Sequence, residues 1–182
     1  MLAIFWDVNG PILVHFQEKG QTVTSARYSD MLVNELKPAI RSKRRGLPSK
    51  RVLLLHDNAC PHTAALTVDK LRALKFEVLK HPPHRPDSAP SDFHLFGPIK
   101  EHLRDQKFAD DNEVMEAVQS WLKATPKSIF LKGIRKLVDR WTKCVAKQGD
   151  HVEKSDTNKF YKYSSKEVII KFLLFSDLPT YI

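Results

Sequence analysis

The chain has 182 residues, of which 42% are hydrophobic and 28% are charged, the balance of one globular domain with an ordinary core. This composition excludes a disordered or collagen-like chain. No apolar run approaches the roughly 20 residues that a bilayer crossing needs, and the N-terminus lacks the pattern of a secretory signal. We therefore expect a soluble protein with no membrane partner and with Cys60 and Cys144 as free thiols.

The net charge of +9 is unevenly distributed along the chain. Residues 37–51 contain seven cations and no acid, and such an excess favours a polyanionic partner. The segment has two open interpretations: a solvated loop, or a strip that contacts DNA phosphates or acts as a nuclear import signal. The DNA-binding candidates are Arg41, Lys43, Arg44, Arg45, Lys50 and Arg51, and the import signal predicts a nuclear location.

The first predicted elements form a β-hairpin followed by a helix. Residues 1–6 (MLAIFW) and 11–16 (PILVHF) are apolar and flank a turn at residues 7–10 (DVNG). Either Thr22 or Thr24 then caps a helix, which Pro38 should kink or end. The apolar positions of that helix follow a period of 3.6 residues: Tyr28, Met31, Leu32, Leu36 and Ile40.

A strand, a helix and a second strand come next. Residues 51–55 (RVLLL) have the pattern of a strand buried on both faces, and residues 76–79 form the next candidate. The helix between them, over residues 63–74, has an apolar stripe made of Ala64, Val68, Leu71 and Leu74. This order favours a parallel pair of strands.

The second half of the chain predicts a stiff loop and then helices. Residues 81–91 hold four of the eleven prolines, each of which biases its predecessor away from the helical region. Ser91 then caps a helix that Pro98 weakens, and further helices follow at 111–123 and 127–147, the latter interrupted near Gly133. From Ser155 the composition changes. We expect one domain over residues 1–153 and a divergent, poorly ordered tail over 154–182.

Two carboxylates occupy positions that suit metal chemistry. Asp57 follows the 51–55 strand, and Asp92 opens the helix after the proline-rich loop. Ligands of open α/β sheets bind at the carboxyl edge of the strands, where Mg²⁺ would relieve the repulsion between two such acids. A two-metal site could then promote displacement at a phosphodiester. The alternative is a turn role for Asp57 and a helix N-terminal role for Asp92.

Two sequence motifs that contain Asp57 and Asp92 resemble those of a known family. Residues 56–62 (HDNACPH) and 81–96 (HPPHRPDSAPSDFHLF) closely resemble the catalytic core of mariner-type transposases of the Tc1/mariner superfamily. In that family the last two members of a three-aspartate set lie in HDN and SDxHLF with 34 residues between them, the number that separates Asp57 from Asp92. Further likeness lies in residues 5–10, 20–23, 133–134 and 140–141, so the resemblance covers about residues 1–153.

The resemblance implies an α/β fold of the RNase H-like (DDE/D transposase) type, with a mixed sheet flanked by helices. It implies Mg²⁺ or Mn²⁺ as cofactor, and hydrolysis followed by strand transfer at transposon ends as activity. Asp57 and Asp92 would be catalytic and would bind the metal. DNA would be the partner, and the family works as a dimer on DNA.

The sequence also departs from the family pattern. The family's first catalytic aspartate lies on a strand upstream of the WD hairpin, and helix-turn-helix domains precede it, whereas this sequence opens with the hairpin. We therefore expect a truncated, catalytically incompetent transposase, since Asp7 sits in a turn and is a poor substitute. That first strand is central in the family's sheet. Its loss predicts two open strand edges, unless the halves close up or a partner fills the gap, and it predicts marginal stability.

Three functional hypotheses follow. The leading one is a mariner-derived fragment that retains at most DNA and divalent-metal binding. The second is an active transposase or nuclease whose upstream part is missing from the gene model, and the third is a domesticated nucleic-acid-binding protein. A structural zinc site is a weaker idea, because its candidate ligands fit no standard zinc-finger spacing: His56, Cys60, His62, His81 and His84. Trp6, Trp121 and Trp141 could stack bases but suit the core better.

Overall fold

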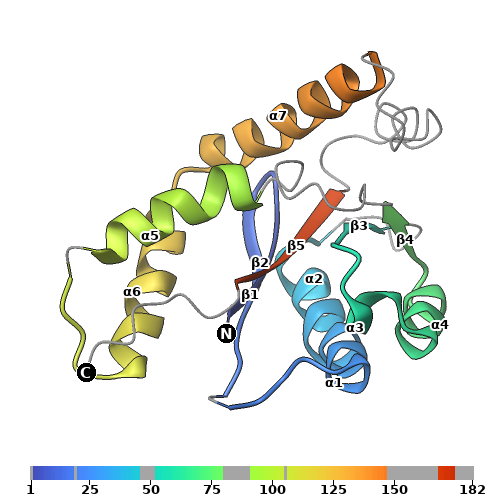
Figure 1. Ribbon diagram of the computed structural model, residues 1–182, viewed down its shortest axis with the longest axis horizontal. Coiled ribbons are helices and arrows are strands. Elements are labelled where there is room, and N and C mark those ends of the chain that lie inside the picture. The colour runs from blue at the N-terminus through green and yellow to red at the C-terminus, as the bar shows by residue number, and fades with distance from the viewer. Residues whose placement is uncertain are drawn as a thin grey trace.

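The computed structural model describes residues 2–18, 20–45, 52–79, 91–104, 106–146 and 168–174. Five strands form one mixed sheet in the order β2-β1-β5-β3-β4 (Figure 1). They are β1 (Leu2–Asp7), β2 (Gly10–Phe16), β3 (Val52–Leu55), β4 (Phe76–Leu79) and β5 (Val168–Leu174). The helices are α1 (Ser25–Asp30), η1 (Met31–Leu36), α2 (Lys37–Lys43), α3 (Cys60–Thr63), α4 (Ala65–Ala73), η3 (Ser91–Phe96), α5 (Gly97–Arg104), α6 (Asp111–Ala124) and α7 (Lys127–Ala146).

The predicted hairpin and the parallel pair of strands are confirmed. β1 and β2 pair antiparallel around the turn, in which the Asp7 carboxylate accepts from the Asn9 N–H at 2.8 Å. β3 and β4 pair parallel, and every residue of β3 is buried. Thr24 is the helix cap, since its hydroxyl accepts from the Arg27 N–H at 3.3 Å.

Two helices continue through a proline that was expected to disrupt them. Pro38 is the second residue of α2 and Pro98 is the second residue of α5, and a π-helical segment, η1 or η3, comes directly before each. Proline offers no N–H and its ring crowds the carbonyl four residues earlier. In the π-helical segment the hydrogen bonds span five residues, as from the Lys37 N–H to the Leu32 carbonyl. This bonding pattern accommodates the proline that follows. The helix predicted to kink or end at Pro38 therefore runs on to Lys43.

Two further helix predictions need correction. Ala64 is extended (φ −60°, ψ 144°) and divides the helix expected over 63–74 into α3 and α4. The break changes the phase of the helix, so Thr67 and Leu71 are buried while Val68 is 39% exposed. In contrast, α7 runs unbroken through Gly133, where an interruption was expected.

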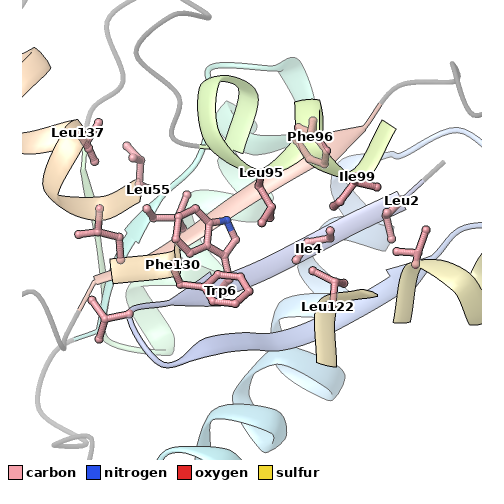
Figure 2. Packing of buried hydrophobic residues seen from close by; sticks show 14 of the residues in the cluster. Leu2, Ile4, Trp6, Leu55, Leu95, Phe96, Ile99, Leu122, Phe130 and Leu137 are labelled. Carbon is pink, nitrogen blue, oxygen red and sulfur yellow. The ribbon is translucent and has the colours of Figure 1, made fainter. Parts of the chain in front are cut away.

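The side chains of the sheet pack into two separate hydrophobic cores, one on each face. The Trp6 cluster packs η3, α5, α6 and α7 against one face, with Ile4, Trp6 and Leu55 from the sheet (Figure 2). The Tyr28 cluster packs α1, η1, α2 and α4 against the other, with Ala3, Phe5 and Leu54 from the sheet. This strict alternation along β1 and β3 is the pattern of strands in the middle of a three-layer domain.

The expected gap in the sheet is closed by β5. β5 lies between β1 and β3, antiparallel to the first and parallel to the second (Figure 1). Ile169 and Ile170 are 0% and 1% exposed and belong to the Tyr28 and Trp6 clusters respectively. Of the outcomes expected for this gap, the one present is that another segment fills it. The division at residue 153 remains a prediction, because residues 147–167 and 175–182 lie outside the described residues.

None of the described helices combines the length and the apolar character needed to cross a bilayer.

Asp110 gives the fold one acid-sensitive helix cap. Its carboxylate accepts from the N–H groups of Glu113 and Asn112, both at 2.9 Å, and these bonds lower its pKa from the ordinary 3.8. Because the pKa of Asp110 is lower in the folded state than in the unfolded state, its charged carboxylate stabilises the fold at a pH above its unfolded-state pKa. This stabilisation is lost as the pH falls through its folded-state pKa. We expect Asp110→Asn to lower the melting temperature at pH 7, and the gap to wild type to shrink below about pH 4. A gap unchanged at strongly acidic pH would contradict this.

Candidate carboxylate site

Asp57 lies just beyond the carboxyl end of β3, with its carboxylate oriented by two neighbours. Oδ1 accepts from the Ala59 N–H at 3.0 Å and from Nδ1 of His62. The same Nδ1 lies 3.3 Å from the Asp57 carbonyl, and the Asp57 side chain is 39% exposed. One carboxylate oxygen is therefore anchored by the protein while the group as a whole reaches solvent.

A buried stack of rings supports His62 from behind. The His62 ring lies 5.0 Å from the His56 ring at an interplanar angle of 25°, and 4.4 Å from the Tyr28 ring. The Tyr28 hydroxyl and His56 Nδ1 are hydrogen-bonded at 3.1 Å. Burial, together with the nearby Asp57 charge, raises the pKa of Tyr28 well above its usual value, so the phenol stays neutral. These contacts fix the His62 ring and, through it, the Asp57 carboxylate.

The histidines proposed as zinc ligands take part in this stack or lie elsewhere. His56 and His62 are buried within it, Cys60 is an exposed thiol, and His81 and His84 fall outside the described residues. In the described part of the chain, no three His, Cys, Asp or Glu side chains converge as a metal cluster would require. The side chain of Cys144 lies outside the described part as well.

Asp92 is the second residue of η3, and its side chain is outside the described part of the structure. The backbone nevertheless places η3 in contact with both β5 and α7. Leu95, one helical turn after Asp92, packs in the Trp6 cluster together with Leu55, which lies two residues before Asp57 (Figure 2). Leu95 of η3 and Leu55 of β3 therefore share one core, whereas the Asp57 carboxylate contacts His62, whose ring packs against Tyr28 of the other cluster. That Asp57 and Asp92 lie close together remains a prediction.

His94 and Gly133 lock η3 onto α7. His94 Nε2 donates to the Ile129 carbonyl at 2.7 Å, and burial is the main cause that lowers the pKa of this imidazole. A Cβ at Gly133 would lie 2.6 Å from His94 Cδ2 and 3.1 Å from the Trp6 ring. Only glycine allows α7 to approach this closely, which gives a packing reason for a glycine inside the helix.

We expect Gly133→Ala to destabilise the fold. Displacing a packed ring typically costs about 1–3 kcal/mol, which outweighs the better helix propensity of alanine, about 1 kcal/mol. The matched control is Gly97→Ala in α5, where an added Cβ meets nothing within 4 Å. In urea unfolding, Gly133→Ala should lose stability while Gly97→Ala stays level or gains slightly. Equal results for the two variants would contradict the close-packing explanation.

Asp7, the residue weighed as a substitute for the missing aspartate, is already engaged in a buried ion pair. It is fully buried, and Arg44 binds both of its oxygens, with Nε to Oδ2 at 2.7 Å and Nη2 to Oδ1 at 2.8 Å. Arg44 Nη2 also donates to the Gly10 carbonyl at 3.0 Å. The members of this pair are 37 residues apart, so no local sequence pattern indicates it. The pair makes Arg44 a structural residue of the hairpin turn.

The remaining cations of the basic strip are divided between surface and undescribed positions. Arg41 and Lys43 are exposed in the last turn of α2, and Arg45 is exposed just after it. Cations suit the negative end of a helix dipole, so part of this charge has a local structural role. Lys50 and Arg51 lie outside the described residues. Three of the six cations predicted to contact DNA are therefore exposed to solvent.

The tryptophans divide in a similar way. Trp6 is fully buried and pairs with Phe130, so it is a core residue. Trp121 is partly buried against the same cluster. The side chains of Arg140 and Trp141 are not in the described part.

Comparisons with known proteins bear on this arrangement. A family model described as "Transposase (partial DDE domain)" matches residues 1–50. The mariner Mos1 transposase of Drosophila mauritiana is 40% identical over 155 residues, which cover 84% of this chain and 45% of that protein. The histone-lysine N-methyltransferase SETMAR of Homo sapiens is 32% identical over 154 residues and 22% of its length. The chain thus spans less than half of either relative.

Solved structures extend the likeness to the fold. A structure of the Mos1 transposase catalytic domain with raltegravir and Mn matches with a TM-score of 0.76 and 40% identity, over 84% of this chain and 76% of that one. A Mos1 paired-end complex with the left transposon end matches with a TM-score of 0.75. The mixed sheet flanked by helices is therefore an RNase H-like fold of the DDE transposase class.

Within this class, the chain belongs to the mariner-type transposase family, of which it represents a C-terminal, catalytic-domain portion.

Proposed function

We propose that this chain binds divalent metal and DNA as a mariner-derived catalytic domain but does not cleave DNA by itself. Asp57 and Asp92 are the proposed metal ligands and Mg²⁺ or Mn²⁺ the proposed metal, in keeping with the Mos1 structures that contain Mn or Mg. The half-exposed, anchored carboxylate of Asp57 fits a hard cation, which prefers oxygen ligands. When bound, such a metal would supply charge neutralisation at a phosphodiester.

The observation that carries the proposed loss of cleavage is the sequence of β5. The strand beside the one that leads to Asp57 reads VIIKFLL and contains no acid. A pair of carboxylates provides less charge and weaker positioning for the metal than three, and both effects are large parts of phosphoryl-transfer catalysis. With Asp7 held by Arg44, no nearby described carboxylate of the hairpin offers itself as the third ligand.

Metal titration tests the site. We expect Asp57→Ala and Asp92→Ala each to weaken Mn²⁺ binding at least tenfold in calorimetry, while Asp69→Ala, which removes an exposed acid on α4, leaves it unchanged. Identical Mn²⁺ binding by wild type and all three variants would exclude a metal site at Asp57 and Asp92. Incubation of wild type with transposon-end DNA and Mn²⁺ should give no cleavage. Cleavage that Asp57→Ala abolishes would instead favour the active-enzyme hypothesis.

DNA binding is assigned to the exposed cations at the end of α2. Each phosphate contact releases a counterion, so the affinity should fall steeply with salt. Arg45→Ala should reduce the slope of log K against log salt by about 1, whereas Arg72→Ala on α4 should not. A purely DNA-binding, domesticated protein predicts the same salt response without any effect of Mg²⁺.

A nuclear location and a homodimer on DNA belong to the same proposal. The basic segment is the candidate import signal, so a fluorescent fusion should lose nuclear enrichment when Lys43 and Arg45 are both replaced by alanine. Sedimentation of the chain with and without DNA reports the oligomeric state. Reading the genomic sequence upstream of Met1 separates the inactive fragment from a truncated gene model, since the latter requires an in-frame strand that carries an aspartate.

A further inference from the structure

Two strands of the sheet, β1 and β3, differ in burial from the outer strands β2 and β4. All six residues of β1 and all four of β3 are buried, whereas β2 and β4 are mostly half-exposed. Burial on both faces is typical of strands with neighbours on each side. β1 and β3 have β2 and β4 on their outer sides, so the inner neighbour of both must come from elsewhere in the chain.

That inner neighbour is a segment separated from β4 by nearly ninety residues. In register, Leu2 to Trp6 of β1 oppose Leu174 to Ile170, and Leu53 to Leu55 of β3 lie beside Val168 to Ile170. Consecutive isoleucines of β5 enter opposite cores, Ile169 the Tyr28 cluster and Ile170 the Trp6 cluster. A shift by one residue would exchange these two faces, so the register is specified by packing as well as by hydrogen bonds.

We propose that Val168–Leu174 acts as a substitute strand, which fills from the C-terminal side the central position that the family's first strand occupies. The slot between β1 and β3 accepts an apolar extended segment, antiparallel to β1 and parallel to β3, and the occupant is this chain's own tail. The substitution completes the backbone pairing of the sheet and joins its two halves. It does not depend on metal or DNA binding.

Disulfide trapping tests the register. Directly opposed Cα atoms in an antiparallel pair lie about 4.5–5.5 Å apart, within the range that a disulfide spans. Ala3 opposes Leu173 in the register of β1 and β5. In a Cys60→Ser, Cys144→Ser background, Ala3→Cys with Leu173→Cys should form a disulfide within one chain. The matched control, Ala3→Cys with Phe172→Cys, is displaced by one residue onto the opposite face and should form at least tenfold less.

The trapping experiment has three informative outcomes. A disulfide within the monomer that is specific to the registered pair supports the proposal. A disulfide between two chains would overturn it in favour of a second copy as the strand donor. Equal or absent cross-linking in both pairs would overturn it altogether.

Amide hydrogen exchange tests the function of the strand. Ile170→Pro removes a strand N–H, and the neutral replacement Ile170→Val keeps both backbone and shape. We expect the proline variant to lose protection at least tenfold on both β1 and β3, while the valine variant keeps it. Wild-type protection of β1 and β3 in Ile170→Pro would show that the sheet does not need β5.

Discussion

Arg44→Ala should be among the most destabilising single substitutions in this chain, although arginine at this position looks from the sequence like one surface cation among seven. Its loss would leave the fully buried Asp7 carboxylate without its counterion. Breaking a buried pair by removing one partner typically costs about 3–5 kcal/mol. Chemical denaturation of the wild type and the variant measures the difference directly.

Two comparisons isolate the cause of that loss. Arg45→Ala removes an exposed neighbour and should change stability by no more than about 0.5 kcal/mol. Adding Asp7→Asn to Arg44→Ala removes the stranded charge and should recover part of the lost stability. If Arg44→Ala were as mild as Arg45→Ala, the pair would have no structural importance and Arg44 would return to the list of DNA-contact candidates.

Trp6→Ala should produce a loss of similar size by a different mechanism. The Trp6 ring is fully buried and lies 5.7 Å from the Phe130 ring, between β1 and the helices of that face (Figure 2). Large-to-small substitution of a buried aromatic residue costs about 3–5 kcal/mol through lost burial and the cavity left behind. Because the same ring also approaches Gly133, the loss should loosen the contact between η3 and α7.

Trp121→Ala is the control for residue type. Trp121 is only partly buried at the edge of the same cluster, so its removal should cost clearly less in the same denaturation experiment. Hydrogen exchange should also show that η3 becomes less protected in Trp6→Ala than in Trp121→Ala. Equal stability losses in the two variants would contradict the central position of Trp6 in this core.

Features that depend on neighbouring residues could be predicted from the sequence. The turn that starts at Asp7, a helix cap at Thr22 or Thr24 and the doubly buried β3 each rest on local chemistry. All three features are present, with Thr24 as the cap. The effects of Pro38 and Pro98 were misjudged because both prolines follow π-helical segments, which have no recognised sequence signal. The phase of α4 was misjudged because one extended residue, Ala64, resets it.

Long-range features could not be predicted in this way. The Asp7–Arg44 pair joins a hairpin turn to a helix end, and nothing near Arg44 distinguishes it from the exposed Arg45. Gly133 reads as a helix breaker until His94 and Trp6 are known to face it. At the candidate site, local patterns predicted that Asp57 follows a strand and that Asp92 opens a helix, and the family strings added the metal role expected of both. The support of Asp57 by His62 required the fold.

The placement of β5 has a consequence for any longer version of this polypeptide. If an aspartate-bearing strand preceded the hairpin, that strand and β5 would compete for the position between β1 and β3, and only one of them could pair there at a time. Molecules with β5 paired in the sheet would be catalytically inactive. Molecules in which β5 had detached could bring the added aspartate together with Asp57 and Asp92. Activity would then report the fraction of molecules in which the tail had been expelled.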